Sequence, residues 1–206
     1  MSNTIDPILI DIPFPIMTPR LMIRNVMPGD GKAMHEVLEE SWTDLCNWME
    51  FTNHGPKTAD DTEKLIRENH ARYILREDIM CAAFTHDRRL ISMCGLHRFD
   101  WTARSFDIGY YVRSSEHNKG YATELANALT RFAFGALDAN RVSISAASNN
   151  AASRRVIEKL EFGLETVTKF DAFLPDGSPT GHASYVRYNI DGLPDLDVTW
   201  ANKLRN

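Results

Sequence analysis

One segment, VRSSEHNKGYATELANALTRF at residues 112–132, limits what this chain can fold into more than any other. The apolar run FDIGYYV before it predicts a strand at 106–112, and the regular apolar spacing after it predicts a long helix. The polar turn between them ends in Lys119 and Gly120. Unpaired N–H groups in the first turn of a helix attract anions, and glycine lets a phosphate approach them closely. The segment therefore predicts either an ordinary capped helix or an anion-binding site.

The remaining pattern predicts an α+β domain with a mixed sheet and helices on its faces. Strands are expected at 20–26, 79–85, 89–97, 141–147, 163–173 and 183–190, and helices at 31–40, 58–76, 121–132 and 150–160. Asp30 is expected to cap the first helix, and Thr58 and Asp61 to form a capping box. An antiparallel meander precedes a β-α-β-α half, so α+β describes this order best.

Length, charge and cysteine content narrow the functional classes. With 206 residues, we expect an extended N-terminal arm at 1–20, one domain at 21–190 and a C-terminal tail at 191–206. A net charge of −5 argues against an extended nucleic-acid surface. The three cysteines form no C-x-x-C pair, the N-terminus is unlike a secretory signal, and no apolar run reaches the roughly 20 residues of a membrane span. We expect a cytoplasmic protein without membrane contact.

The seven histidines are scattered, without the spacing of metal ligands, so no metal site is expected. The sequence leaves open whether the protein is a monomer or a homodimer.

Several segments, in matching order, resemble the GNAT acetyltransferases. Gly120 and Ala122 fill the last two fixed positions of the family's pyrophosphate signature [RQ]-x-x-G-x-[GA], while His117 stands where the family has Gln or Arg. The strand DIGYYV and the segment NRVSISAASNNAASRRVIEKLEF are similar to two further family motifs. NWMEF followed by TADD resembles the RimJ/RimL-like branch, which acetylates protein N-termini. The resemblance covers roughly residues 20–190.

The resemblance implies a GNAT fold, whose mostly antiparallel sheet is splayed between its two central strands. It also implies that acetyl-CoA lies along the strand 106–112, that the Val112 N–H polarises the thioester carbonyl, and that an amine attacks directly. The cofactor-binding residues implied in this way are Tyr111, Val112, Arg113, His117, Asn118, Lys119, Gly120, Tyr121, Ala122, Thr123 and Asn150.

The same resemblance implies two catalytic residues, each with an ordinary structural alternative. Asp107 occupies the place of a glutamate in many members and is the candidate general base; alternatively it pairs with an arginine or a backbone amide. Ser153 is the candidate general acid, or a hydroxyl that caps its own helix. Asn150 is either a helix N-cap or a contact to pantetheine.

Some family positions differ here. The tyrosine acid of other branches corresponds to Ile157, and the proposed Rim-type glutamate base to Ala172. Asp171 lies next to it, but a slip of one residue turns a strand side chain to the other face. Glu161 replaces the glycine at a helix end, where a left-handed residue costs roughly 1 kcal/mol.

Three functions remain open. The first is acetyl transfer to the N-terminal α-amine of a protein or peptide, the second is transfer to a small amine such as an aminoglycoside, polyamine or amino acid, and the third is a non-catalytic acyl-CoA sensor. Trp42, Trp48 and Phe51 are expected either in the core or along an apolar rim that selects the acceptor.

Overall fold

The fold is known from a computed structural model that describes residues 6–201. Its helices are α1 (Gly31–Leu45), α2 (Ala59–Ile74), α3 (Tyr121–Ala136) and α4 (Ala151–Lys159), with short 3₁₀ turns η1 (Pro7–Leu9), η2 (Glu50–His54) and η3 (Ser114–Glu116). Its strands are β1 (Ile16–Met17), β2 (Leu21–Asn25), β3 (Ile79–Thr85), β4 (Leu90–Asp100), β5 (Ser105–Val112), β6 (Arg141–Ala147), β7 (Gly163–Val167), β8 (Ala172–Phe173), β9 (Pro179–Thr180), β10 (His182–Arg187) and β11 (Thr199–Trp200).

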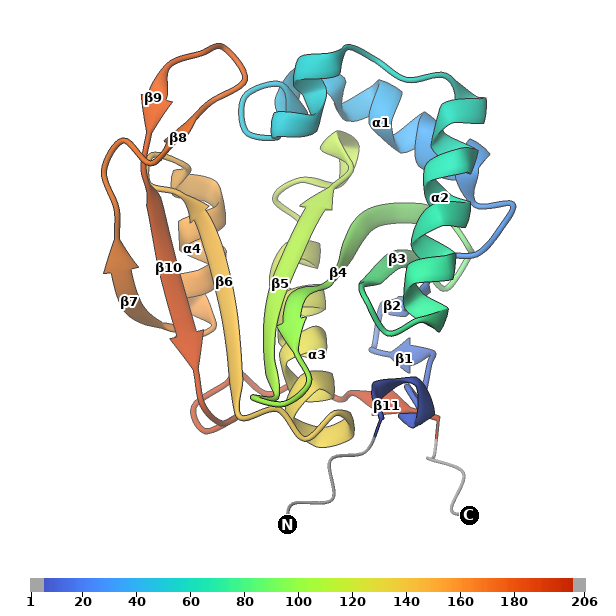
Figure 1. Ribbon diagram of the computed structural model, residues 1–206, viewed down its shortest axis with the longest axis vertical. Coiled ribbons are helices and arrows are strands. Elements are labelled where there is room, and N and C mark those ends of the chain that lie inside the picture. The colour runs from blue at the N-terminus through green and yellow to red at the C-terminus, as the bar shows by residue number, and fades with distance from the viewer. Residues whose placement is uncertain (1–5, 202–206) are drawn as a thin grey trace.

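A nine-stranded sheet, ordered β11-β1-β2-β3-β4-β5-β6-β10-β7, forms the centre of the molecule (Figure 1). Every neighbouring pair in it is antiparallel except β5 and β6, which are parallel. The predicted mixed, mostly antiparallel α+β architecture is therefore confirmed.

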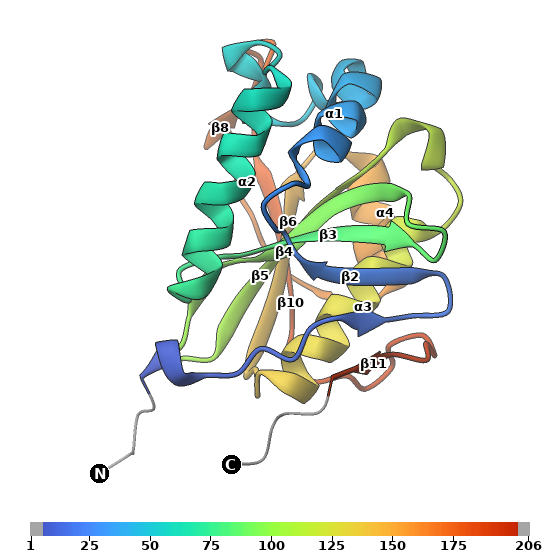
Figure 2. The same cartoon turned by 90° about the vertical axis from the view of Figure 1, so that its right-hand side faces the viewer.

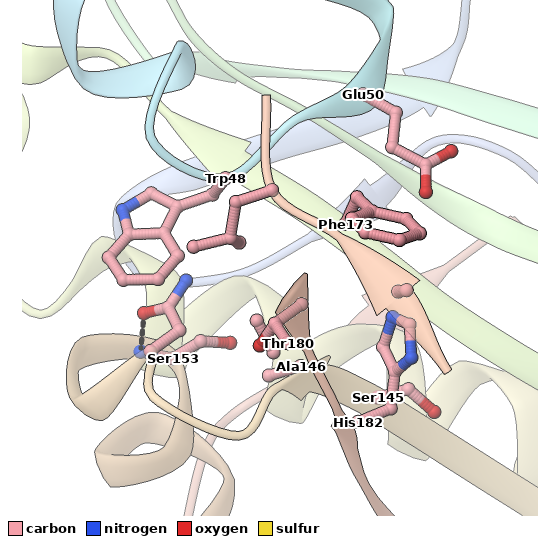
Figure 3. A pocket seen from close by; sticks show the side chains of 12 residues that line it. Trp48, Glu50, Ser145, Ala146, Ser153, Phe173, Thr180 and His182 are labelled. Atoms are coloured by element: carbon pink, nitrogen blue, oxygen red, sulfur yellow. Dashed lines mark hydrogen bonds between the residues drawn. The ribbon is translucent and has the colours of Figure 1, made fainter. Parts of the chain in front are cut away.

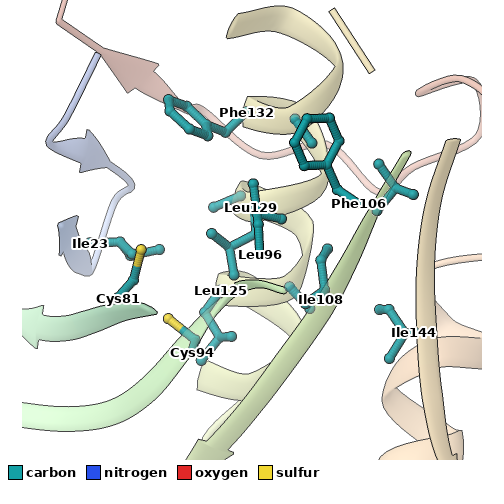
Figure 4. Packing of buried hydrophobic residues seen from close by; sticks show 14 of the residues in the cluster. Ile23, Cys81, Cys94, Leu96, Phe106, Ile108, Leu125, Leu129, Phe132 and Ile144 are labelled. Carbon is teal, nitrogen blue, oxygen red and sulfur yellow. The ribbon is translucent and has the colours of Figure 1, made fainter. Parts of the chain in front are cut away.

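Two separate apolar clusters hold helices against the two faces of this sheet. Leu125, Leu129 and Phe132 of α3 pack on Phe106 and Ile108 of β5 (Figure 4). On the other face, α1 and α2 form their own cluster with apolar side chains of β3 and β4. Figure 2 shows α2 and α3 on opposite sides of the strands. Burying both faces explains the near-continuous apolar runs in β3 and β4.

The two central strands part after a short paired stretch. Pairing between β5 and β6 covers Ser105–Asp107 against Arg141–Ser143 and stops there. Beyond this point β5 stays with β4 up to Val112, while β6 stays with β10 up to Ala147. The predicted splay is confirmed, and Figure 1 shows β5 and β6 diverging from their common end.

Asp107 lies at the point where β5 and β6 separate. Its carboxylate accepts a 2.7 Å hydrogen bond from Ser143 Oγ across the last β5–β6 pair. It also forms an ion pair with Arg98. The side chain thus ties the two strands together at the point where their backbone pairing ends.

The strand expected at 163–173 is wrong in its second half. Strand β7 ends at Val167, where Thr168 Oγ1 donates to Asp171 at 2.6 Å and Phe170 takes a left-handed φ of 55°. This tight turn redirects the chain, and Ala172–Phe173 pair with β9 in a separate two-stranded hairpin. Side-chain hydrogen bonding by Thr and Asp in a turn overrode the β-propensity of the run.

The helix starts were predicted with mixed success. Thr58 and Asp61 form the expected capping box of α2. Asp30 is at the N-cap of α1, but its carboxylate does not cap the helix; it binds the Arg24 side chain and the Met27 N–H instead. A nearby guanidinium offers a charge-assisted bond, which is stronger than a neutral cap.

The two ends of the described chain extend the sheet. Met17 and Ile16 of β1 pair with β2 on one side and with Thr199 and Trp200 of β11 on the other. The predicted boundaries at residues 20 and 190 remain a prediction, but parts of the arm and the tail lie in the same sheet as the domain. Within residues 6–201, no helix is long and apolar enough to cross a bilayer.

Glu161 has the left-handed conformation expected at the end of α4, with φ of 54°. Because glycine adopts this conformation freely, Glu161→Gly should be more stable than Glu161→Ala by about 1 kcal/mol. Both variants lose the carboxylate, so their difference isolates the backbone effect. Urea unfolding of the two proteins measures it, and an alanine variant as stable as the glycine variant would contradict the prediction.

Candidate active site

The fork between β5 and β6 opens into a cleft of about 570 Å³. The N-terminus of α3 forms one end of it, where Gly120 takes a left-handed φ of 83° and no side chain caps the helix. Tyr121, Ala122 and Thr123, the first turn of α3, line the cleft. Uncapped first-turn N–H groups beside a glycine are what the predicted anion site requires, and anion binding there stays a prediction.

Arg20 fixes this helix start and adds positive charge. Its guanidinium lies 4.4 Å from the centre of the Tyr121 ring, donates to the Lys119 carbonyl at 2.8 Å and pairs with buried Glu124 at 2.5 Å. A Cβ on Gly120 would lie 3.4 Å from Arg20 Nη2. The guanidinium therefore lies directly beside the uncapped turn, with its charge paired to Glu124.

The free edge of β5 presents peptide groups to the cleft. Arg113 N–H donates to the Ile91 carbonyl of β4 at 2.7 Å. Since successive peptides of a strand point in opposite directions, the Val112 N–H and C=O point away from β4, toward the gap. His117 Nε2 donates to the Val112 carbonyl from that side at 2.9 Å. The Val112 N–H can therefore reach a ligand held along β5.

A pair of hydroxyls lies between β5 and α4. Tyr110 Oη and Ser153 Oγ are 3.3 Å apart, and Asn150 Oδ1 accepts the Ser153 N–H at 3.0 Å as the N-cap of α4. Burial raises the pKa of Tyr110, with the Ser153 hydrogen bond acting in the opposite direction. Tyr110 thus keeps its proton at neutral pH and can donate it to an anion that forms in the cleft.

A second, smaller cavity of about 160 Å³ adjoins the cleft (Figure 3). Trp48, Asn150 and Ser153 line both spaces, so the two meet at the start of α4. The smaller cavity is bounded further by Glu50 of η2, by the β8–β9 hairpin with Phe173, and by Ser145 and His182 of the neighbouring strands β6 and β10.

Most of the residues predicted from the sequence come together here. Those lining the cleft are Tyr111, Val112, His117, Asn118, Gly120, Tyr121, Ala122, Thr123, Asn150 and Ser153. Asn150 is the N-cap of α4 and also lines the cleft, whereas the Ser153 hydroxyl pairs with Tyr110 and does not cap its own helix. The functional roles of all these residues remain predictions.

Three predicted residues point elsewhere. Arg113 pairs with Glu40 of α1 at 2.5 Å, and Lys119 pairs with Glu116 at 3.0 Å. Neither lines the cleft. Asp107 lines neither cavity, and its bonds to Arg98 and Ser143 favour the ion-paired alternative over that of a base.

Sequence reasoning missed several residues of the site. Tyr110 lies inside a predicted strand and was not selected. Because successive side chains of a strand point to opposite faces of the sheet, Tyr110 and Tyr111 must face opposite sides. Arg155 and Lys159 line the cleft from α4, and their i, i+4 spacing was a signal for a shared basic face. Arg20 and His182 carried no local signal, since only the tertiary fold brings them to the site.

Comparison with known proteins identifies the family. Residues 20–163 match the family model described as an acetyltransferase (GNAT) domain. The chain belongs to the GNAT acetyltransferases. This membership makes it an acetyl-CoA-dependent acetyltransferase, and the GNAT fold predicted from the sequence is confirmed.

Among its relatives is YdaF of Bacillus subtilis (strain 168), whose name provisionally describes it as a ribosomal N-acetyltransferase. It is 30% identical over 170 residues, which cover 82% of this chain and 90% of YdaF.

Two solved structures share the fold. RimL, a ribosomal L7/L12 α-N-protein acetyltransferase in complex with coenzyme A, superposes with a TM-score of 0.78 at 18% identity, covering 84% of this chain and 96% of RimL. Mycobacterium smegmatis RimJ, in complex with a CoA disulfide, gives 0.76 at 20% identity, covering 87% and 88%.

Glu40 ties α1 to the loop that leads into the α3 N-terminus. Burial works to raise its pKa, but hydrogen bonds from Ser115 and Arg113 outweigh this and lower the pKa to about 2. A depressed pKa stabilises the fold where the carboxylate is ionised, above about pH 4.5, and this contribution is lost as the pH falls toward 2.

Glu40→Gln should therefore lower the free energy of unfolding by about 1 kcal/mol at pH 7, discounted for the partly exposed side chain. The difference from the wild type should shrink as the pH falls from 5 to 2. Denaturant unfolding across this range measures it, with Glu39→Gln as the control, since Glu39 is exposed and faces only His35. A difference independent of pH would contradict the prediction.

Proposed function

We propose that this GNAT enzyme transfers the acetyl group of acetyl-CoA to the N-terminal α-amine of a protein or peptide. The small cavity beside the cleft carries this proposal. Its volume of about 160 Å³ is below the ~300–1,000 Å³ typical of sites that enclose a whole small molecule. A space of this size accommodates the end of a chain, with the remainder outside.

The charge of the cavity supports the same acceptor. Glu50 is the single carboxylate among its lining residues, and Trp48 and Phe173 supply apolar walls. An aminoglycoside or polyamine carries several positive charges, which acidic clusters attract, whereas a peptide terminus carries one. The relatives point in the same direction by name, since YdaF is provisionally named a ribosomal N-acetyltransferase and RimL a ribosomal L7/L12 α-N-protein acetyltransferase.

The larger cleft supplies the place for the cofactor. Its pyrophosphate fits against the uncapped first turn of α3 beside Arg20, and its pantetheine arm fits along the unpaired edge of β5. The thioester then comes close to the Val112 N–H, which stabilises the developing oxyanion. Tyr110 and Ser153 stand together as donors for the departing thiolate.

The amine attacks the thioester carbon directly, and the carbon–nitrogen bond forms as the carbon–sulfur bond breaks. This route requires no nucleophilic cysteine. Cys81 and Cys94 are fully buried, and burial raises the pKa of both thiols, so neither supplies a thiolate. With acetyl-CoA as donor and a protein terminus as acceptor, we expect the enzyme to act in the cytoplasm.

The acceptor is tested by thiol release from acetyl-CoA with a panel of amines. We expect turnover with short peptides that have a free N-terminus, and none when the same peptides are blocked at the N-terminus and keep only a lysine amine. Turnover limited to aminoglycosides, polyamines or free amino acids would replace the proposed acceptor. Acetyl-CoA binding without turnover on any amine would make the protein a sensor.

The cofactor site is tested by Gly120→Trp. The indole would fill the space against the first turn of α3, where the pyrophosphate is proposed to bind. Acetyl-CoA affinity, measured by calorimetry, should therefore fall at least ~100-fold, which corresponds to about 2.8 kcal/mol of lost contacts. Gly29→Trp is the matched control, because Gly29 also has a positive φ, has open space around its Cβ position and lies outside both cavities. Unchanged affinity in the Gly120 variant would remove the site.

A further inference from the structure

We propose that His182, oriented by Asp171, is the general base that accepts the proton of the incoming amine. The inference rests on the proposed acetyl transfer and names the residue that makes the amine nucleophilic. Sequence motifs gave no reason to select His182, and the two positions considered for a base, Asp107 and Ala172, provide no free carboxylate in the cavity.

The geometry around His182 orients its ring. His182 is the first residue of β10, and Nδ1 lies 3.3 Å from Asp171 Oδ1. In this arrangement Nδ1–H donates to the carboxylate and leaves Nε2 as the acceptor. The turn that ended β7 early is what brings Asp171 to this place, through its 2.6 Å bond from Thr168.

Asp171 is fixed as an anion. The hydrogen bond from Thr168 lowers the pKa of its carboxyl; burial opposes this effect and His182 adds to it. A carboxylate beside one nitrogen of an imidazole fixes the tautomer and stabilises the protonated ring. Asp171 is therefore a positioning residue and makes no contact with the substrate.

The imidazole projects into the small cavity next to Ser145 (Figure 3). The same cavity is lined by Ser153, whose hydroxyl is paired with Tyr110 in the cofactor cleft. The proposed base and the proposed acid thus lie along one continuous space, on the acceptor side and the cofactor side of the thioester. This is the order that acyl transfer requires.

The protons balance as follows. The incoming ammonium group gives its first proton to His182 Nε2, which passes it to solvent through the open side of the cavity. The neutral amine attacks the carbonyl carbon, and the carbon–sulfur bond breaks. The nitrogen then loses its second proton to His182, and the thiolate receives one from Tyr110 or Ser153. That hydroxyl regains a proton from solvent, and His182 again releases its proton to solvent. The products are therefore the amide, the free thiol and one released proton.

Other titratable groups lie near the cavity. Glu50 lines the same cavity from η2, and Lys169 lies in the adjoining turn beside Asp171. Another histidine beside an aspartate, His97, contacts Asp78 at 2.9 Å but lines neither cavity. Among the described residues lining the small cavity, His182 is the one imidazole.

A histidine base also favours one class of amine. An α-ammonium has an ordinary pKa near 8 and a lysine ammonium one near 10.4, so the same base deprotonates the α-amine about 250-fold more readily. The proposed base therefore strengthens the preference for N-terminal amines.

The test is the pH–rate profile of the full-length protein with its best acceptor and acetyl-CoA. In the wild type, kcat should fall as the pH drops through the range in which imidazole becomes protonated. In His182→Gln, kcat at pH 7 should be lower by about 100-fold, with the KM for acetyl-CoA within twofold. The variant's rate should then rise steadily with pH, because hydroxide increasingly deprotonates the amine.

Asp171→Asn separates positioning from simple folding effects. Without the anionic partner the imidazolium is less stable, so the acid limb of the profile should move to lower pH and kcat should fall less than in His182→Gln. Addition of imidazole to His182→Ala should restore part of the rate. An acid limb that stays in place in Asp171→Asn would contradict the orienting role.

His97→Gln is the matched control and should keep the wild-type profile. If His182→Gln keeps an acid limb with the wild-type midpoint and a plateau above it, the proposal is overturned. If that limb is lost in Glu50→Gln or Asp107→Asn instead, the base is that carboxylate. The rates are measured on whichever amine the wild type acetylates. If the wild type acetylates only small amines and His182→Gln loses the acid limb, the proposed acceptor is rejected and His182 remains the base. If the wild type acetylates no amine, both proposals are rejected.

Discussion

The parting of β5 from β6 after Asp107 is the constraint on which the rest of the site depends. A paired strand has no free peptide groups, so a ligand can lie against β5 only where its neighbour has left. The last pair is reinforced by the Asp107–Ser143 hydrogen bond, and each strand beyond it is held by its other neighbour. The open edge is therefore a rigid feature of the sheet, and the first turn of α3 follows it directly.

Two spaces with different chemistry meet at this fork. The larger one combines an uncapped helix start with the cationic side chain of Arg20, which suits a negatively charged cofactor. The smaller one is bounded by aromatic side chains and by His182, whose ring is held by Asp171 outside the cavity lining, and this suits the proposed amine that must lose a proton. Ser153 lines both, so the hydroxyl pair with Tyr110 marks the junction at which we propose that transfer takes place.

The sequence predicted what local patterns determine. Apolar periodicity located the main strands and helices, and the Gly120 turn indicated the anion site because its chemistry is contained in a few adjacent residues. The sequence prediction failed where a side-chain hydrogen bond competes with the backbone pattern. The Asp30 carboxylate binds Arg24 and does not cap its helix, and the Thr168–Asp171 bond ends a strand that propensity would have continued. His182 and Arg20 reach the site only through sheet topology, so no local pattern could select them.

A crystal structure of the protein with bound acetyl-CoA tests the central claim most directly. The account predicts the diphosphate against the backbone of residues 120–123, the pantetheine arm in the gap beyond Asp107, and the acetyl group facing the cavity that contains His182. A cofactor bound elsewhere, or a gap closed by β6 pairing with β5 up to Val112, would contradict it.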